Sequence, residues 1–261
     1  MPATHTNSYA LGSRDVVLVE PSTPFPEERR RWVNWARGLE SQGRKLVAIV
    51  ATHHHADHIG GAAFFSEALN IPVWAHAFAA ERLDFPVARR LDDGDVIQLA
   101  GPEPQRWVVH ITPGHAPGHV CLHEPSLSML IAGDMVASEG TILIAPGEGD
   151  MAEYIRQLIR LAALDPAVVL PAHGAPIPRE ARIFARYVEH RLLRETKVLR
   201  VLAVRKKGTL EQLLPEVYDD VSKSVYPIAL LSLQTHLEKL VREGKVKLID
   251  ETYVLDDGVN A

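Results

Sequence analysis

The chain has 261 residues, enough for one large domain or for one domain with a small second one. It is 46% hydrophobic and 23% charged, with a formal net charge of −5, as in ordinary globular proteins. Residues 1–179 carry 14 Lys and Arg against 20 Asp and Glu, and residues 180–261 carry 14 against 13. Neither part has the basic excess of a polyanion-binding protein, although a local stripe or a bound cation can supply charge that totals hide.

The single cysteine, Cys121, excludes an internal disulfide framework, so the hydrophobic core must supply the stability. Residues 1–6 lack the charged and then apolar pattern of a secretory signal, and no apolar run approaches the length that spans a membrane. We therefore expect a cytoplasmic protein without a membrane partner.

The first third of the chain alternates strands and helices, as βαβ units do. The expected strands are 8–11, 15–19, 46–51 and 73–75, and the expected helices are 27–42, 61–69 and 78–83. A strand-rich part follows, with strands at 96–99, 107–111, 119–123, 129–132 and 167–170 and a helix at 150–164. Two mixed halves of this kind predict a layered α/β sandwich.

The character of the sequence changes at residue 179. We expect a long helix at 179–207, helices at 210–217 and 227–243, and a hairpin of 245–250 with 252–255. Helix, helix and hairpin at this size are typical of a winged-helix domain. We place a catalytic domain at 1–185 and a winged-helix-like domain at 186–261.

Four imidazoles and a carboxylate crowd into residues 53–58, where the apolar strand 46–51 ends and glycines begin. His53 and His55 share one face of an extended segment and can together hold a metal ion. Asp57 and His58 lie further round the turn and can serve a second ion. The alternative is a solvated loop that is rich in histidine, and His54 fits that description.

A site for two metal ions needs more ligands than this cluster offers, and the ends of later strands carry three candidates. His115 lies in Thr-Pro-Gly-His after strand 107–111, Asp134 lies in Gly-Asp after strand 129–132, and His173 lies in a late His-Gly after strand 167–170. Each stands beside glycine, which lets the backbone approach closely. Singly each can be a turn or capping residue; together with the cluster, ligation is favoured.

His-X-His-X-Asp-His, Thr-Pro-Gly-His, Gly-Asp and His-Gly, in this order over residues 7–180, resemble the metallo-β-lactamase superfamily, in the group of hydrolases that includes glyoxalase II. The resemblance implies a four-layered αββα sandwich. It also implies that His53, His55 and His115 bind one ion, that Asp57, His58 and His173 bind the second, and that Asp134 bridges them.

The winged-helix-like tail and the Gly147–Tyr154 stretch narrow the resemblance to the branch of beta-lactamase-like protein 2. That branch includes an endoribonuclease for single-stranded RNA, and related fungal members are thioesterases. We expect two divalent metal ions, zinc first, with iron or manganese as alternatives. A hydroxide between the ions would attack the substrate, with Asp57 orienting it and shuttling a proton.

The sequence leaves the substrate open. We put an RNA phosphodiesterase first and a thioesterase or other small-ester hydrolase second, followed by a mononuclear iron oxygenase and by a DNA-binding regulator. The basic run 205–207 reads as a helix C-terminus, so sequence-specific DNA binding is disfavoured. The expected partners are a small ester or thioester or single-stranded RNA, and a second copy of the chain.

His119 has two interpretations, as a substrate-binding residue or as a hydrogen-bonded structural histidine, and we include it in the site as a substrate-binding residue. Cys121 and Tyr154 are assigned to the core.

Overall fold

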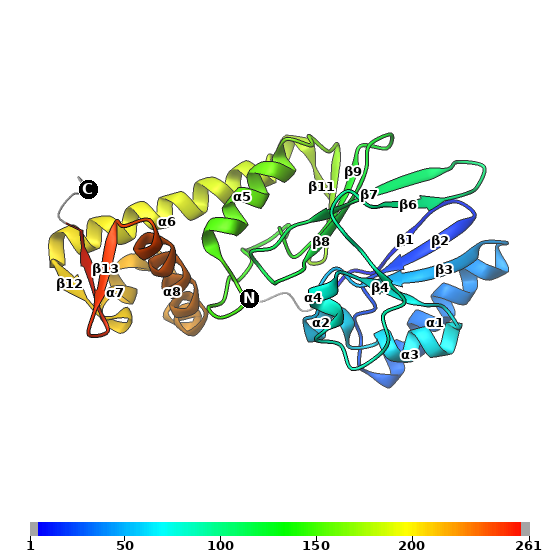
Figure 1. The fold of residues 1–261 in the computed structure, drawn as a ribbon, viewed down its shortest axis with the longest axis horizontal. Helices are drawn as coiled ribbons and strands as arrows, with labels where there is room; N and C mark the ends of the chain where they lie inside the picture. The colour runs from blue at the N-terminus through cyan, green and yellow to red at the C-terminus, as the bar shows by residue number, and fades with distance from the viewer. Residues whose placement is uncertain (1–4, 257–261) are drawn as a thin grey trace.

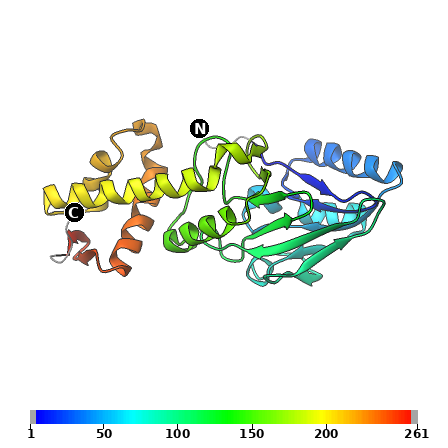
Figure 2. The same cartoon turned by 90° about the horizontal axis from the view of Figure 1, so that it is seen from above.

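The computed structural model describes residues 5–256 and shows an elongated molecule (Figure 1). The ends of the two predicted domains, 1–4 and 257–261, lie outside the described residues. The larger part is a sandwich of two sheets with helices on its outer faces, and one long helix joins it to a smaller, mainly helical part (Figures 1 and 2).

The first sheet has the strand order β1-β2-β3-β4-β5, in which β1 and β2 are antiparallel and the other neighbours are parallel. Its strands are β1 (Tyr9–Leu11), β2 (Asp15–Val19), β3 (Lys45–Val50), β4 (Val73–Ala75) and β5 (Arg89–Arg90). The accompanying helices are α1 (Pro26–Ser41), α2 (Ala56–Ile59), α3 (Ala62–Leu69) and α4 (Ala77–Ala80). In β2, Val16 and Leu18 pack with residues of α1, whereas Val17 and Val19 pack with the second sheet. Burial on both faces explains the unbroken apolar run.

The second sheet has the strand order β11-β10-β9-β8-β7-β6. Its strands are β6 (Val96–Leu99), β7 (Gln105–Ile111), β8 (Val120–Glu124), β9 (Met129–Gly133), β10 (Val168–Pro171) and β11 (Ile177–Pro178). Strands β6 to β9 form an antiparallel meander, and β10 pairs in parallel with β9. The outer face packs against α5 (Met151–Ala162) and the first turns of α6 (Ile183–Arg205). The predicted four-layered αββα sandwich is confirmed.

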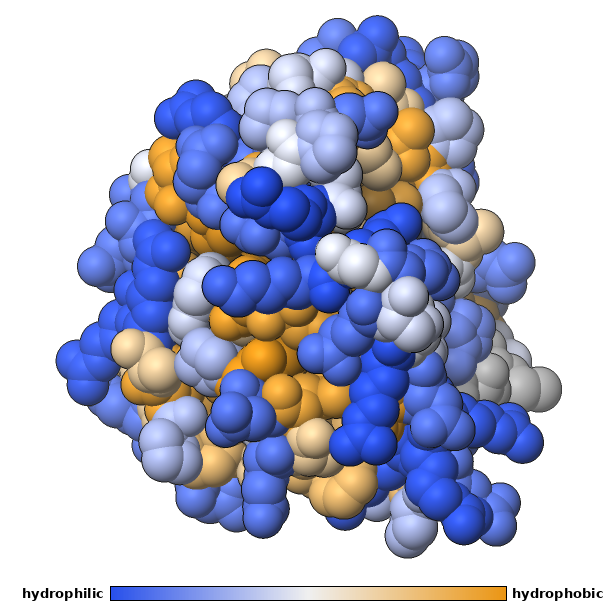
Figure 3. All heavy atoms as spheres, turned by 90° about the vertical axis from the view of Figure 1, so that its right-hand side faces the viewer, coloured by the Kyte–Doolittle hydropathy of each residue, from blue (hydrophilic) through white to orange (hydrophobic). Residues whose placement is uncertain are grey.

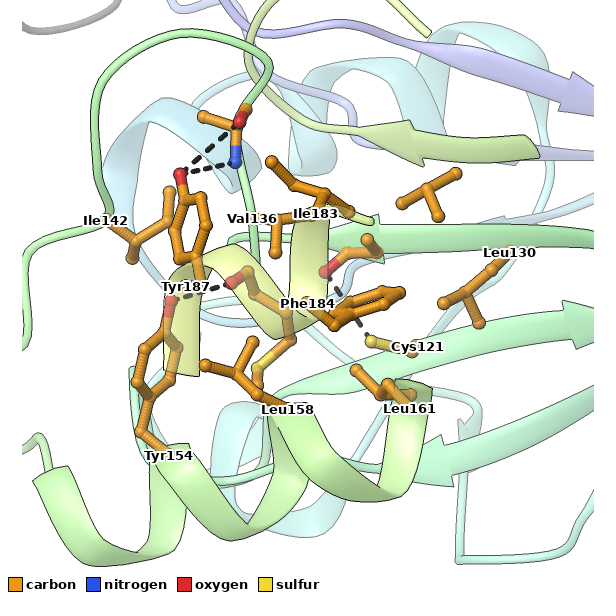
Figure 4. Close-up of a cluster of buried hydrophobic side chains, with 14 of the residues drawn as sticks. Cys121, Leu130, Val136, Ile142, Tyr154, Leu158, Leu161, Ile183, Phe184 and Tyr187 are labelled. Atoms are coloured by element: carbon orange, nitrogen blue, oxygen red, sulfur yellow. Dashed lines mark hydrogen bonds between the residues drawn. The ribbon is translucent and has the colours of Figure 1, made fainter. Parts of the chain in front are cut away.

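A buried cluster between the second sheet and helices α5 and α6 also fixes the backbone that follows β9 (Figure 4). The Tyr154 hydroxyl donates a hydrogen bond of 2.7 Å to the carbonyl of Met135. The Tyr187 hydroxyl accepts one of 3.0 Å from the N–H of Ala137. Cys121 is fully buried in the same cluster, as its assignment to the core requires.

The smaller part consists of the second half of α6, two further helices and a three-stranded sheet in the order β12-β14-β13. Its further elements are β12 (Lys207–Gly208), α7 (Leu210–Val217), a 3₁₀ turn η2 (Lys223–Val225), α8 (Tyr226–Arg242), β13 (Val246–Ile249) and β14 (Thr252–Leu255). Thr209 precedes α7 and forms a capping box with Gln212, whose side-chain oxygen accepts a hydrogen bond from the N–H of Thr209. The predicted winged-helix domain is confirmed.

Helix α6 belongs to two hydrophobic cores. Ile183, Phe184 and Tyr187 pack in the core beside the second sheet, whereas Val198 and Leu202 pack with α7 and α8. The predicted domain boundary between residues 185 and 186 falls in its first turn and stays a prediction.

The expected helix at 179–207 begins later in the structure. Residues Arg179–Ala181 form a 3₁₀ turn, and Arg182 has a left-handed backbone with φ 47°, so α6 starts at Ile183. The sequence showed no break there because no glycine marks the left-handed position. The two-residue strands β5, β11 and β12 were not expected, since such short segments show no periodicity.

Hydrophilic side chains cover most of the molecule's end on the right of Figure 1, and hydrophobic atoms show between them in its middle (Figure 3). Over residues 5–256, none of the helices combines the length and the apolar character needed to cross a membrane.

Candidate metal centre

The seven predicted ligand side chains gather at one end of the sandwich, although they come from four separate loops. His53 and His55 follow β3, Asp57 and His58 lie in α2, His115 follows β7, Asp134 follows β9, and His173 follows β10. Strands β7, β9 and β10 run in the same direction, so their carboxyl ends meet at one edge of the sheet. This shared edge explains how residues far apart in the chain become neighbours.

Three imidazoles form the first group. Nδ1 of His55 lies 3.0 Å from Nε2 of His53 and 3.0 Å from Nε2 of His115. These three nitrogens lie within 4.8 Å of one another, so their lone pairs can converge on a single ion. Three imidazole nitrogens are a common zinc ligand set in proteins.

A second group consists of Asp57, His58 and His173, whose ligand atoms also lie within 4.8 Å of one another. Asp134 lies between the groups. Its Oδ2 is 3.5 Å from Nε2 of His115 in the first group and 3.5 Å from Nε2 of His58 in the second, and its Oδ1 is 3.2 Å from Nε2 of His173. One carboxylate therefore faces both groups.

The donor atoms themselves fit metal ions. Nε2 of His58 and Oδ1 of Asp134 are buried and have no hydrogen-bond partner among residues 5–256. Nε2 of His173 lies 3.2 Å from this Oδ1, and carboxylate oxygens lie 3.5 Å from this Nε2, but neither contact has the geometry of a hydrogen bond. Buried polar atoms of natural proteins nearly always have such a partner, so a bound cation would complete the surroundings of both atoms. Imidazole nitrogens and carboxylate oxygens in two adjoining groups suit divalent cations.

The electrostatics of the first group and of Asp134 favour the protonation states that ligands need. Burial lowers the pKa of His53 well below 6.5, and the nearby imidazoles of His58 and His115 lower it further. Burial also lowers the pKa of His115 to about 4. For Asp134 burial opposes the charge, but contacts with His173 and His58 hold its pKa well below 3.8. Neutral His53 and His115 and an ionised Asp134 can thus donate electron pairs. In the second group the direction is opposite: the hydrogen bond to Asp134 raises the pKa of His173, and Glu20 and Asp134 raise that of His58 against the effect of its burial.

His119 is fully buried, and the centre of its ring lies 5.1 Å from that of His53 and 6.3 Å from that of His115. Its Nδ1 lies 2.7 Å from the hydroxyl of Thr112, and its Nε2 accepts a hydrogen bond of 3.0 Å from the N–H of Asp134. Both ring nitrogens are therefore engaged within the protein. The substrate-binding role of His119 stays a prediction, and these two contacts suit its alternative interpretation as a hydrogen-bonded structural histidine.

Gly133 permits this arrangement. It has a φ of +50°, and a Cβ placed on it would lie 2.5 Å from Nε2 of His119 and 3.1 Å from the hydroxyl of Thr52. Glycine alone combines that backbone with so close an approach.

In His58 and His55, the ring nitrogen that does not face the other candidate ligands lies beside a glutamate that was not predicted from the sequence. The buried carboxylate of Glu20 is 2.9 Å from Nδ1 of His58, and Glu20 has a φ of 61°, which is unusual for a residue with a side chain. The carboxylate of Glu148 is 3.0 Å from Nε2 of His55 and 3.0 Å from Nε2 of His54. Glu20 follows strand β2 at the edge where the cluster lies, and Glu148 stands between two glycines. Those positions were the available signals.

Comparisons with known proteins agree with the architecture. Residues 1–173 match the metallo-beta-lactamase superfamily, and residues 209–252 match the beta-lactamase associated winged helix domain. A beta-lactamase-like protein 2 homolog from Caenorhabditis elegans is 27% identical over 252 residues, which cover 93% of this chain and 80% of that protein. The resemblance to that branch is thereby confirmed.

Two further relatives bear on function and fold. An atrochrysone carboxyl ACP thioesterase from Aspergillus chevalieri is 28% identical over 253 residues, which cover 92% of this chain and 77% of that protein. The crystal structure of a metallo-beta-lactamase family protein from Thermus thermophilus superposes with a TM-score of 0.76 at 24% identity, covering 96% of this chain and 93% of that one. The latter likeness concerns the fold alone.

Proposed function

Because this chain belongs to the metallo-beta-lactamase superfamily and is a hydrolase of that superfamily, we propose that it works with two divalent metal ions, zinc first, at the carboxyl ends of β3, β7, β9 and β10. The observation that carries the proposal is the position of Asp134 between two groups of three donors. A mononuclear iron enzyme needs only one of those groups.

The proposed ligands follow from the geometry. His53, His55 and His115 would hold one ion, Asp57, His58 and His173 would hold the other, and Asp134 would contact both. Bound divalent ions supply Lewis acidity and lower the pKa of water, so a nucleophile is available near neutral pH.

Asp57 is the candidate catalytic residue. Its side chain is 60% exposed, whereas that of His58 is fully buried, so Asp57 faces the open side where a substrate arrives. Its Oδ2 lies 3.5 Å from Nε2 of His58 and 3.6 Å from Nε2 of His173. We propose that this carboxylate orients the attacking water and carries its proton to the leaving group.

We assign His119 a positioning role. Its hydrogen bond to the N–H of Asp134 fixes the backbone that presents the shared carboxylate. A histidine held by Thr112 on one side and by this N–H on the other cannot reorient without breaking a buried hydrogen bond.

For the substrate we propose an ester or thioester. The thioesterase from Aspergillus chevalieri aligns with 92% of this chain, and the formal net charge of −5 does not favour a polyanion. The RNA phosphodiesterase that the sequence analysis put first stays a prediction, which the same experiment tests. Helix α6 ends at Arg205, the first residue of the basic run 205–207, and Arg205 forms an ion pair with Glu216. Both observations support the interpretation of this run as a helix end and not as a DNA contact.

The experiment is to load the purified protein with zinc and to measure metal content and hydrolysis of an acyl thioester panel and, separately, of labelled single-stranded RNA. We expect two ions per chain, cleavage of thioesters and loss of both in Asp134→Ala. Asp84→Ala, a substitution of an exposed aspartate outside the site, is the matched control. Cleavage of RNA alone would replace the thioester assignment, and full activity of Asp134→Ala would overturn the metal mechanism. One iron per chain would favour the oxygenase.

We also propose a cytoplasmic location and a homodimer. A single buried thiol suits a reducing compartment. Leu193 and Val204, which are 70% and 81% exposed on α6, are candidate contacts between two copies. Cell fractionation and light scattering of the purified protein test these two points.

A further inference from the structure

The segment of residues 143–150, hereafter the 143–150 segment, touches the first group of ligands on one side and α8 on the other. We propose that Glu148 is a positioning residue for His55, and that α8 of the C-terminal domain sets the geometry of the first metal group by holding this segment. The inference rests on the proposed metal centre and deepens it, because it assigns the winged-helix domain a part in building that centre.

The two ring nitrogens of His55 face different partners, and Glu148 is the partner of Nε2. Nδ1 faces His53 and His115, whereas Nε2 faces a Glu148 oxygen at 3.0 Å. A carboxylate only accepts hydrogen bonds, so Nε2 must carry a proton, and in the neutral imidazole Nδ1 then presents its lone pair. The second oxygen of Glu148 holds His54 in the same way. The carboxylate thereby selects the tautomer and the ring orientation that ligation needs.

The backbone of the 143–150 segment also contacts His115, the ligand of the first group that follows β7. The carbonyl of Leu143 lies 2.9 Å from Nδ1 of His115, and the N–H of Asp150 donates a hydrogen bond of 2.9 Å to the carbonyl of Gly114. Both ends of the segment therefore touch the loop that carries His115. Two of the three ligands in the first group depend on its position.

Helix α8 holds the same segment from the opposite side. The hydroxyl of Thr235 donates a hydrogen bond of 3.0 Å to the carbonyl of Ile144. Arg242 binds Asp150 through two hydrogen bonds of 2.6 and 2.8 Å. The C-terminal domain thus grips the segment near each end, with Glu148 between the two contacts.

A purely structural role explains only part of these contacts. Asp150 also accepts hydrogen bonds from the first N–H groups of α5, so capping alone accounts for its presence. Capping does not account for a carboxylate, 43% exposed, that is shared between two histidines two residues earlier. The ion pair of Arg242, whose side chain is 55% exposed, contributes little to global stability, so variants at this position should fold.

The test uses the full chain and measures zinc affinity by competition with a chromophoric chelator, together with the electronic spectrum of the cobalt(II)-loaded protein. We expect Glu148→Ala to weaken the binding of one of two ions about 10–100-fold and to alter the cobalt spectrum. Glu148→Gln should recover part of the loss, because its single carbonyl oxygen can still accept from one imidazole. Arg242→Ala should change both readouts in the same direction by less.

Matched controls separate this effect from a general one. Glu139→Gln replaces an exposed glutamate in the preceding loop, and Arg205→Ala removes another exposed ion pair of the C-terminal domain; both should bind zinc as the wild type does. The double variant Glu148→Ala/Arg242→Ala should lose less than the sum of the single losses, since both act on one segment. Wild-type affinity and spectrum in Glu148→Ala and Arg242→Ala would overturn the inference. A wild-type protein that binds no zinc would instead refute the metal centre itself.

Discussion

Replacing Gly133 by alanine should damage the site more than an alanine at any open glycine turn. Gly133 joins β9 to Asp134 and has a φ of +50°. An added Cβ would lie 2.5 Å from Nε2 and 3.0 Å from Cε1 of His119, which is fully buried and fixed at both ring nitrogens. The ring therefore cannot move aside without losing a hydrogen bond.

The cost has two parts. A left-handed backbone costs a residue with a side chain about 1–2 kcal/mol. Forcing one more carbon into a packed interior costs about 1–3 kcal/mol. We therefore expect Gly133→Ala to lower the free energy of unfolding by about 2–5 kcal/mol. It should also weaken metal binding, because the hydrogen bond from the N–H of Asp134 to Nε2 of His119 is disturbed.

Gly94→Ala is the matched control, because Gly94 has a φ of +83° and no atom within 4 Å of the added Cβ. It should cost the backbone part alone, about 1–2 kcal/mol. Urea unfolding followed by tryptophan fluorescence suits the comparison, since all four tryptophans lie before residue 110 and report on the sandwich. Equal urea midpoints for the two variants would refute the argument from close packing.

Three further predictions follow from buried or charged groups. Tyr154→Phe should destabilise the protein by about 1–2 kcal/mol, because the buried carbonyl that accepts its hydrogen bond loses its partner; calorimetry measures this. Glu20→Gln should weaken the binding of one zinc ion about 10-fold or more, because Nδ1 of His58 loses a charged acceptor; chelator competition measures this. Asp220 forms hydrogen bonds with Arg194, which lower its pKa from 3.8 to about 2. Because the folded pKa is depressed, its stabilisation is complete above about pH 4 and is lost as the pH falls towards 2; at 54% exposure it amounts to less than about 1 kcal/mol. The difference in Tm between wild type and Asp220→Asn should therefore shrink over that range.

Each of these predictions has a clear contrary result. A Tm of Tyr154→Phe equal to that of the wild type would show that the hydroxyl hydrogen bond adds nothing to stability. Unchanged zinc affinity in Glu20→Gln would mean that the carboxylate does not act on the ligand. A constant difference in Tm between wild type and Asp220→Asn from about pH 5 to about pH 2.5 would exclude the titration of that carboxylate as its cause.

The candidate ligands could be predicted from the sequence because the cluster 53–58 is dense in histidine and the later three each closely follow an apolar strand beside glycine. Such runs are visible locally, and His115, Asp134 and His173 were found in this way. The residues that hold them were not found. Glu20 contacts a histidine 38 residues away in the chain, and Glu148 contacts one 93 residues away. Contacts at such separations depend on how the loops pack, which local periodicity does not encode.

The fold, like the site, could be predicted from the sequence only where the signal is local. Strands β2 and β3 are buried on both faces and read as continuous apolar runs, so their positions were clear. The start of α6 was not, because Arg182 adopts a left-handed backbone that favours glycine. The role of His119 depends on a single hydrogen bond to a backbone N–H, for which a sequence carries no sign.

The long helix α6 limits which insertions and deletions the protein can tolerate. Its 23 residues run without interruption from one core to the other. One inserted residue in its middle would rotate everything beyond it by about 100° and advance it by about 1.5 Å. Arg242 would then swing away from Asp150, and α8 would leave the loop that it holds. Insertions and deletions should therefore be rare in this helix among relatives that keep both domains, and an exchange of the C-terminal domain would have to preserve its length.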